Sequence, residues 1–122
     1  MATYYIRENS EEAIVFTLQR DATGSGVPVV YNLTGLTEVR FYRYTETDVQ
    51  DYLSNVTHPT RLAVLVAANG TVRLTPANTY WQPGTYRGWL EVLMSGKWYR
   101  FPDGGDAPAD SVHTFIVLHK HQ

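Results

Sequence analysis

The stretch from Thr85 to Leu93 reads Thr-Tyr-Arg-Gly-Trp-Leu-Glu-Val-Leu, and it indicates the fold more clearly than any other part of the chain. Successive side chains of a β-strand point to opposite faces, so this alternation predicts a strand with one apolar face and one mixed face. The apolar face would carry Tyr86, Gly88, Leu90 and Val92. The mixed face would carry Thr85, Arg87, Trp89, Glu91 and Leu93. Ser95-Gly96 favours a tight turn, so we expect a hairpin with a second strand over 97–101.

Other short segments show the same signs of strand structure, with turn residues between them every 8 to 12 residues or so, about the spacing of small β-proteins. They span 13–20, 29–32, 37–44, 62–67, 71–75 and 112–119. Asn69-Gly70 separates two of them and is a strong hairpin signal. No amphipathic helix of useful length is visible. The pattern therefore predicts an all-β fold, an antiparallel sandwich of about seven to eight strands, as one domain over 1–122.

Two stretches need separate treatment. Within 45–60, the i, i+3, i+4 spacing of Val49, Tyr52 and Leu53 fits a short helix near residues 47–54, and a long ordered loop fits equally well. In 62–67 the side chains are apolar on both faces, which predicts a central, buried strand.

The charge pattern argues against nucleic acid and membranes as partners. The chain has 10 Lys and Arg against 12 Asp and Glu, a net charge of −2, and these charges form no basic run. Neutralising phosphates requires a concentrated positive field. The longest apolar run, 62–68, is too short to cross a bilayer. There is no cysteine and no apolar leader near the N-terminus, so we expect synthesis in a cytosol.

No group of residues has the order of a known catalytic site, so we expect no enzymatic activity and no cofactor. His113, His119 and His121 have strand-like spacing and raise the alternative of a zinc site, but no carboxylate lies in register beside them. The acidic loop 103–110 lacks the ligand spacing of a calcium loop and is interpreted as a turn. We therefore predict no metal.

Two groups of segments carry a family resemblance. The first comprises Phe-Thr-Leu-Gln-Arg-Asp over 16–21, Leu-Thr-Gly over 33–35 and Val-Arg-Phe over 39–41. The second comprises Pro-Gly-Thr-Tyr-Arg over 83–87, Leu-Glu-Val over 90–92 and Gly-Lys-Trp-Tyr-Arg-Phe-Pro over 96–102. Together they resemble the immunoglobulin-like N-terminal domain of phage baseplate upper proteins and related tail proteins.

The resemblance extends over 13–119 and includes no catalytic motif. It implies an immunoglobulin-like β-sandwich that is a non-enzymatic structural component of a bacteriophage tail or baseplate. Its expected partners are other virion proteins and copies of itself, as a homo-oligomer. It also implies synthesis in the cytoplasm of the bacterial host and a final location in the virion. The insertion 45–59 and the pair Tyr80-Trp81 depart from the family pattern, which leaves the position in the particle open, capsid decoration included.

The predicted mixed face of 85–93 contains the first candidate for an interaction site. Trp89 lies there with Arg87 and Glu91, and an exposed tryptophan often marks an interface. The alternative is that a loop, such as 45–59, covers it. On the other face, Tyr86 follows a Pro-Gly turn, where a tyrosine typically bonds back to the upstream backbone as a tyrosine corner.

Tyr80-Trp81, in a loop between strands, is the second candidate. Such rings can stack on sugars, which makes a carbohydrate-binding module or receptor-adsorption domain the alternative function. A wider platform would add Tyr42, Tyr44, Trp98 and Tyr99. The competing interpretation is that Tyr80 and Trp81 pack over the end of the sandwich.

Overall fold

The strand expected over 85–93 is the centre of the larger sheet. It forms β9 (Gly84–Met94), which pairs antiparallel with β5 (Glu38–Thr45) along one edge. The other edge of β9 is shared by β11 (His113–Leu118) near its beginning and β10 (Lys97–Phe101) near its end. β9 therefore touches three strands, which explains why its sequence has the most regular alternation.

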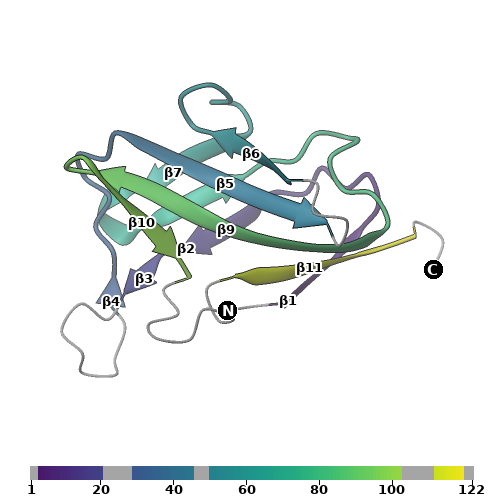
Figure 1. Ribbon diagram of the computed structural model, residues 1–122. Coiled ribbons are helices and arrows are strands. Elements are labelled where there is room, and N and C mark those ends of the chain that lie inside the picture. The colour runs from purple at the N-terminus through teal and green to yellow at the C-terminus, as the bar shows by residue number, and fades with distance from the viewer. Residues whose placement is uncertain (1–2, 21–28, 46–49, 103–111, 120–122) are drawn as a thin grey trace.

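The computed structural model describes residues 3–20, 29–45, 50–102 and 112–119, and this part of the chain is all-β apart from one short 3₁₀ helix (Figure 1). The acidic loop 103–110 and His121 lie outside the described residues. Within them, no helix is long and apolar enough to cross a membrane.

The edges of the larger sheet are formed by two short strands. β6 (Gln50–Ser54) pairs antiparallel with β5, and β1 (Thr3–Arg7) pairs parallel with β11. The strand order is β1-β11-β9-β5-β6, with β10 attached to β9. The expectation of an antiparallel sheet is therefore wrong for the β1–β11 pair, and the sheet is mixed. The N-terminal strand β1 was not predicted from the sequence.

The smaller sheet holds β2 (Ile14–Thr17), β8 (Thr71–Leu74) and β7 (Leu62–Val66), in the order β2-β8-β7. The predicted hairpin at Asn69-Gly70 is confirmed, although the 3₁₀ helix η1 (Ala67–Asn69) forms part of its turn.

A third, two-stranded sheet completes the described part of the chain. β3 (Gln19–Arg20) pairs antiparallel with β4 (Val29–Val30). The strand expected over 13–20 is thus divided between two sheets, because β2 pairs with β8 while β3 pairs with β4.

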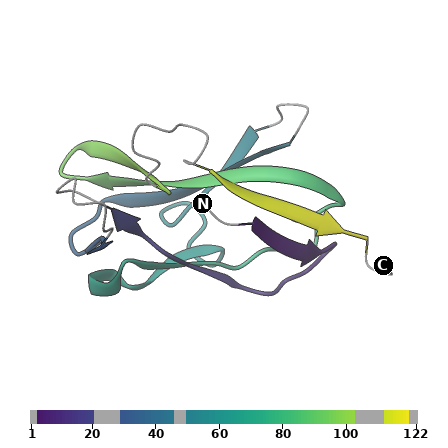
Figure 2. The ribbon, with the colours of Figure 1, turned by 90° about the horizontal axis from the view of Figure 1, so that it is seen from below.

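The core lies between the two larger sheets, which face each other as two layers (Figure 2). Phe16 of β2 stacks on Phe41 of β5 with ring centres 5.7 Å apart, and Phe115 of β11 meets Phe41 edge-on at 5.6 Å. Burying one such ring contributes about 1.5–3 kcal/mol. Gly88 makes this packing possible, because a Cβ there would stand 2.9 Å from Phe41 Cζ and 2.8 Å from the carbonyl oxygen of Tyr42.

The helix expected near residues 47–54 is wrong over 50–54, where the chain forms β6; residues 47–49 lie outside the described part. Leu53 of β6 is buried in the core, and Tyr52 points to the opposite face. The spacing of Val49, Tyr52 and Leu53 fits either structure locally, and pairing with β5 decides in favour of the strand.

The strand over 62–67 was expected to be central, and this is wrong too. β7 is an edge strand that pairs with β8, and its Leu65 and Val66 are 43% and 48% exposed. The register shifts between Val64 and Val66, so the regular pairing is interrupted at this end of β7, where Leu65 and Val66 stay outside the core.

Burial of His113 predicts an acid-sensitive contribution to stability. Its imidazole packs against Phe16 and Tyr4, and burial lowers its pKa from 6.5 to about 4. Between these two values the unfolded chain binds a proton that the folded chain does not. The free energy of unfolding therefore falls as the pH drops from about 6.5 to about 4.

We expect a His113→Phe variant to lose less stability than the wild type between pH 7 and pH 4.5. The difference should be on the order of 1–2 kcal/mol, less than the full pKa shift implies because the ring is only half-buried. Urea denaturation at both pH values measures it. Equal losses in the two proteins would contradict the buried, neutral state of His113.

Candidate functional site

The outer face of the larger sheet collects aromatic side chains from three strands in one row. The register places Tyr52 of β6 opposite Tyr42 of β5, and Tyr42 opposite Trp89 of β9. Side chains that are direct cross-strand neighbours on one face are close enough to pack. Tyr42 accordingly stacks on Trp89 with ring centres 5.3 Å apart and packs against Tyr52 in a tilted arrangement at the same distance.

Trp89 is covered by side chains of neighbouring strands. It is 8% exposed, with Tyr42 on one side, Tyr44 edge-on at 5.7 Å and the guanidinium of Arg100 at 4.2 Å from the ring centre. Its Nε1 donates to Glu91 at 2.7 Å. Trp89 is therefore covered, as the alternative interpretation had it, but the covering side chains Tyr42, Tyr44 and Arg100 come from β5 and β10 and not from a loop.

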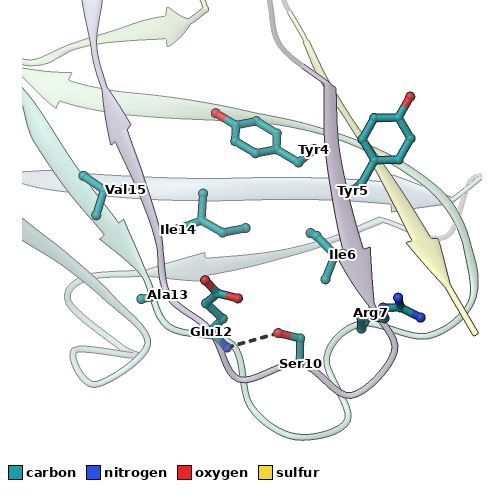
Figure 3. Close-up of a pocket in the computed structure, with 9 residues that line it drawn as sticks. All are labelled: Tyr4, Tyr5, Ile6, Arg7, Ser10, Glu12, Ala13, Ile14 and Val15. Carbon is teal, nitrogen blue, oxygen red and sulfur yellow. Dashed lines mark hydrogen bonds between the residues drawn. The ribbon is translucent and has the colours of Figure 1, made fainter. Parts of the chain in front are cut away.

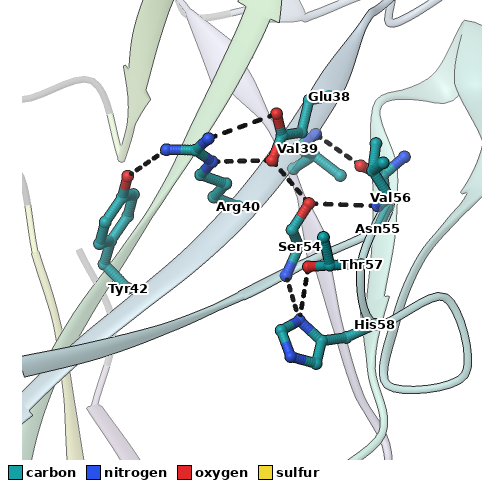
Figure 4. Close-up of polar contacts among 9 residues, drawn as sticks. All are labelled: Glu38, Val39, Arg40, Tyr42, Ser54, Asn55, Val56, Thr57 and His58. Atoms are coloured by element: carbon teal, nitrogen blue, oxygen red, sulfur yellow. Dashed lines mark hydrogen bonds and ion pairs between the residues drawn. The ribbon is translucent and has the colours of Figure 1, made fainter.

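Arg40 is the second residue of this face that several neighbouring side chains surround. Its guanidinium carbon lies 4.8 Å from the ring centre of Tyr52 and 4.7 Å from that of Trp98. Arg40 Nε donates to Glu38 at 2.8 Å, and Nη1 donates to the Tyr42 hydroxyl at 3.1 Å (Figure 4). The guanidinium is thus fixed by two rings and two oxygen acceptors before any partner arrives.

Glu38 is held in place by Ser54, the last residue of β6. The buried Ser54 hydroxyl donates to Glu38 at 2.6 Å, and the Ser54 amide donates to His58 Nδ1 at 3.2 Å (Figure 4). The hydrogen bond from Arg40 keeps the pKa of Glu38 below its ordinary value, although burial opposes the shift. His58 contacts the amide of Ser54, while the hydroxyl is engaged by Glu38, so this Ser-His pair does not have the geometry of an activated nucleophile.

We call this surface the aromatic–arginine face. Its members are Glu38, Arg40, Tyr42, Tyr44, Tyr52, Arg87, Trp89, Glu91, Trp98 and Arg100. Tyr52 and Trp98 are its exposed rings, at 45% and 41%. It includes three arginines against two glutamates, so it is net positive on a chain whose net charge is −2. Tyr, Trp and Arg are the residues enriched at the energetic centres of protein interfaces.

Tyr80 and Trp81 are placed in the core. Trp81 is fully buried and stacks on Phe115 with ring centres 5.2 Å apart, while Tyr80 lies edge-on to Trp81 at 4.9 Å. The guanidinium of Arg43 lies 3.5 Å from the Tyr80 ring centre and is paired with Asp51 at 2.9 Å. Neither ring is open to a flat ligand, so the sugar-stacking interpretation of this pair is wrong and the packing interpretation holds.

Tyr86 makes an upstream backbone contact of the expected kind, with the hydroxyl as the acceptor. The Gln82 amide donates to the Tyr86 hydroxyl at 3.3 Å, and the ring packs edge-on to Trp81. The residues expected to form the wider platform do not share one face of the sheet. Trp98 is on the aromatic–arginine face, whereas Tyr99 is on the opposite side, against Tyr31.

Sequence reasoning missed Arg40 and Tyr52. The available signal was the alternation of Gln-Asp-Tyr-Leu-Ser over 50–54. In a strand this alternation directs the side chains of Tyr52 and Leu53 to opposite faces. Once β6 is taken as a strand beside β5, its exposed tyrosine lies next to the outer side chains of β5. Arg40 then stands between Tyr52 and the β10 hairpin.

The histidines that the structure describes are dispersed. His113 is half-buried among aromatic rings, and His119 Nδ1 lies 4.0 Å from Glu8 at the other end of β11. In the part of the chain that the structure describes, no group of three His, Cys, Asp or Glu side chains is arranged to hold a metal ion.

Comparison of the sequence with protein-family models and with curated proteins finds no match to either. The aromatic–arginine face and the sequence resemblance are therefore the observations that bear on function.

Proposed function

We propose that the chain is a non-enzymatic structural protein of a bacteriophage virion, a tail or baseplate component that acts through protein–protein assembly. On this proposal the two facing sheets are an immunoglobulin-like sandwich of the kind found in phage baseplate upper proteins. The observation that carries the assembly role is the aromatic–arginine face, where Tyr52 and Trp98 remain exposed beside a fixed guanidinium.

Pre-organisation of Arg40 favours binding of a partner to this face. A free arginine loses side-chain entropy when a partner orders it, and this cost is subtracted from the binding free energy. Arg40 is already ordered by Glu38, Tyr42 and the two flanking rings. A partner that covers this face gains burial of Tyr52 and Trp98 without that cost, which suits a permanent assembly.

The test is membership of the particle. We expect mass spectrometry of gradient-purified virus particles to find the chain at a fixed copy number relative to other tail proteins. Its presence in the infected cell together with its absence from purified particles would contradict the proposal.

A carbohydrate-binding or receptor-adsorption domain is the second candidate, and the exposed rings of Trp98 and Tyr52 are the observation in its favour. The chain has three tryptophans, of which Trp81 and Trp89 are buried, so a sugar-dependent change in tryptophan fluorescence would have to come from Trp98. On the assembly proposal we expect no such change with a panel of cell-surface oligosaccharides. Quenching that disappears in Trp98→Ala would favour the sugar-binding candidate instead.

A further inference from the structure

The side of the molecule where β1 and β2 run past each other contains a cleft of about 410 Å³ (Figure 3). Ile6 of β1 and Ile14 of β2 face each other across it, with Tyr4 above them and Glu12 beside Ile14 (Figure 3). Arg7 also borders the cleft, but Figure 3 shows its side chain on the far side of β1. The volume lies within the range of pockets that enclose a small ligand or a large side chain, about 300–1,000 Å³.

The cleft is open to another chain because it lies between two strands that end their sheets. β1 is one edge of the larger sheet and β2 is one edge of the smaller sheet. Unpaired strand edges are places where a second chain can approach closely. The turn that joins them contains Glu8, Glu11 and Glu12, and the last two are exposed. The cleft therefore has an apolar floor, formed by Ile6 and Ile14, and a polar border with Glu12 and Arg7, while the exposed Glu11 stands in the turn beside it.

The aromatic–arginine face has the complementary properties. Trp98 projects from the β9–β10 hairpin with 41% of its surface exposed, and the guanidinium of Arg40 lies 4.7 Å from its ring centre. Arg100 lies on the same face of β10 as Trp98 and is exposed, and Lys97, beside the hairpin turn and on the other face of the strand, is exposed as well. An aromatic ring flanked by positive charge thus stands on one face, and a cleft with an apolar floor and acidic residues at its border lies at another.

We propose that the partner of the aromatic–arginine face is a second copy of this chain, docked head to tail, with Trp98 of one copy in the β1–β2 cleft of the next. This inference rests on the proposed assembly function and names its partner. Carboxylates of the cleft border, Glu11 and Glu12, pair with Lys97 and Arg100 across the contact.

The charges favour this arrangement over contact between two identical faces. A two-fold symmetric contact would place the net positive face against itself, and Arg40, Arg87 and Arg100 would approach their own copies. Juxtaposed like charges cost several kcal/mol in an interface. Glu38 and Glu91 offset this only in part, because the face carries three arginines and two glutamates. A head-to-tail contact has no such repulsion, and it closes into a ring or extends as a filament.

The experiment is light scattering on a size-exclusion column, over a wide concentration range, with wild type and four variants. We expect the wild type to elute as a multiple of the 13.8 kDa protomer. Trp98→Ala, the pair Glu11→Lys with Glu12→Lys, and the pair Lys97→Glu with Arg100→Glu should each elute as the protomer. The variant that combines all four charge changes keeps the net charge of the wild type and should regain the larger mass.

Thermal melts verify that each variant is folded, so that a loss of mass reports on the contact. Recovery in the four-fold variant would support the proposal, because a general loss of folding would not be reversed by further substitutions. A larger mass that depends on Trp98 but is unaffected by changes at Glu11 and Glu12 would overturn the cleft as the partner site while the face keeps its role. A wild type that stays monomeric throughout would also overturn self-docking, and particle membership by mass spectrometry would still test the proposed function separately.

Discussion

Replacing Trp81 with alanine is expected to lower the free energy of unfolding by about 3–5 kcal/mol, the range for removing a large aromatic side chain from a core. Trp81 is fully buried, it stacks on Phe115 and it meets Tyr80 and Tyr86 edge-on. Alanine would leave a large void among rings that are themselves fixed by the sheet. Since domains of this kind are stable by only about 5–15 kcal/mol, the loss is a large fraction of the total.

Urea denaturation followed by far-ultraviolet circular dichroism measures this loss, and Trp98→Ala is the matched control. Trp98 belongs to β10 and is 41% exposed, so its removal should cost about 1 kcal/mol or less. A Trp81→Phe variant should fall between the two, because phenylalanine keeps part of the stack on Phe115. Equal stability of Trp81→Ala and Trp98→Ala would show that the loop around Trp81 does not form part of the core.

The burial of Trp81 also shows why the sequence was ambiguous about this loop. Residues 76–84 contain Pro, Asn and Gly, which is the composition of a surface connection, so exposed rings were a fair interpretation. The rings are buried because the loop folds over the end of the sheets against Phe115, a residue more than thirty positions later. Composition gives no information about a contact of that kind.

The central strands were predictable because their signals are local. The alternation over 85–93, the Ser95-Gly96 turn and the strand over 97–101 all agree with β9 and β10. Ser95 and Gly96 have φ of 51° and 79°, and positive φ at both turn positions is the geometry that matches the twist of a hairpin. Neighbouring residues determine this part of the fold, so one sequence is sufficient to find it.

The edge strands were harder to predict, because their pairing with another strand, and not a clear local pattern, determines their structure. β1 has five residues and is stabilised by β11, at the opposite end of the chain. β6 has a spacing that suits a helical turn as well as a strand, and its register with β5 resolves the ambiguity. The arrangement of the candidate site was hard to predict for the same reason. Alternation correctly placed Trp89 on the outer face, but the cover by Tyr42 and Arg100 requires the register of three strands.

Gly70→Ala is expected to be the other strongly destabilising substitution, at about 2–5 kcal/mol. Gly70 has φ of 66°, where an L side chain costs about 1–2 kcal/mol of backbone strain. A Cβ at this position would also stand 2.5 Å from the carbonyl oxygen of Tyr31 and 3.0 Å from that of Leu18. Both neighbours are backbone atoms, so neither can rotate away, and overpacking of this kind adds about 1–3 kcal/mol.

Gly96→Ala separates the two causes. Gly96 has φ of 79° and a Cβ there would meet no atom within 4 Å, so this variant should show the backbone strain without the clash. The excess cost of Gly70→Ala over Gly96→Ala, measured by urea denaturation, is therefore the steric term. That term has a structural meaning, because the Leu18 amide donates to the Gly70 carbonyl at 2.8 Å and the Tyr31 amide donates to the Leu18 carbonyl at 2.8 Å. Gly70 thus joins the β7–β8 turn to the segments that flank β3 and β4, and an equal cost at both glycines would show that these segments are not packed together in solution.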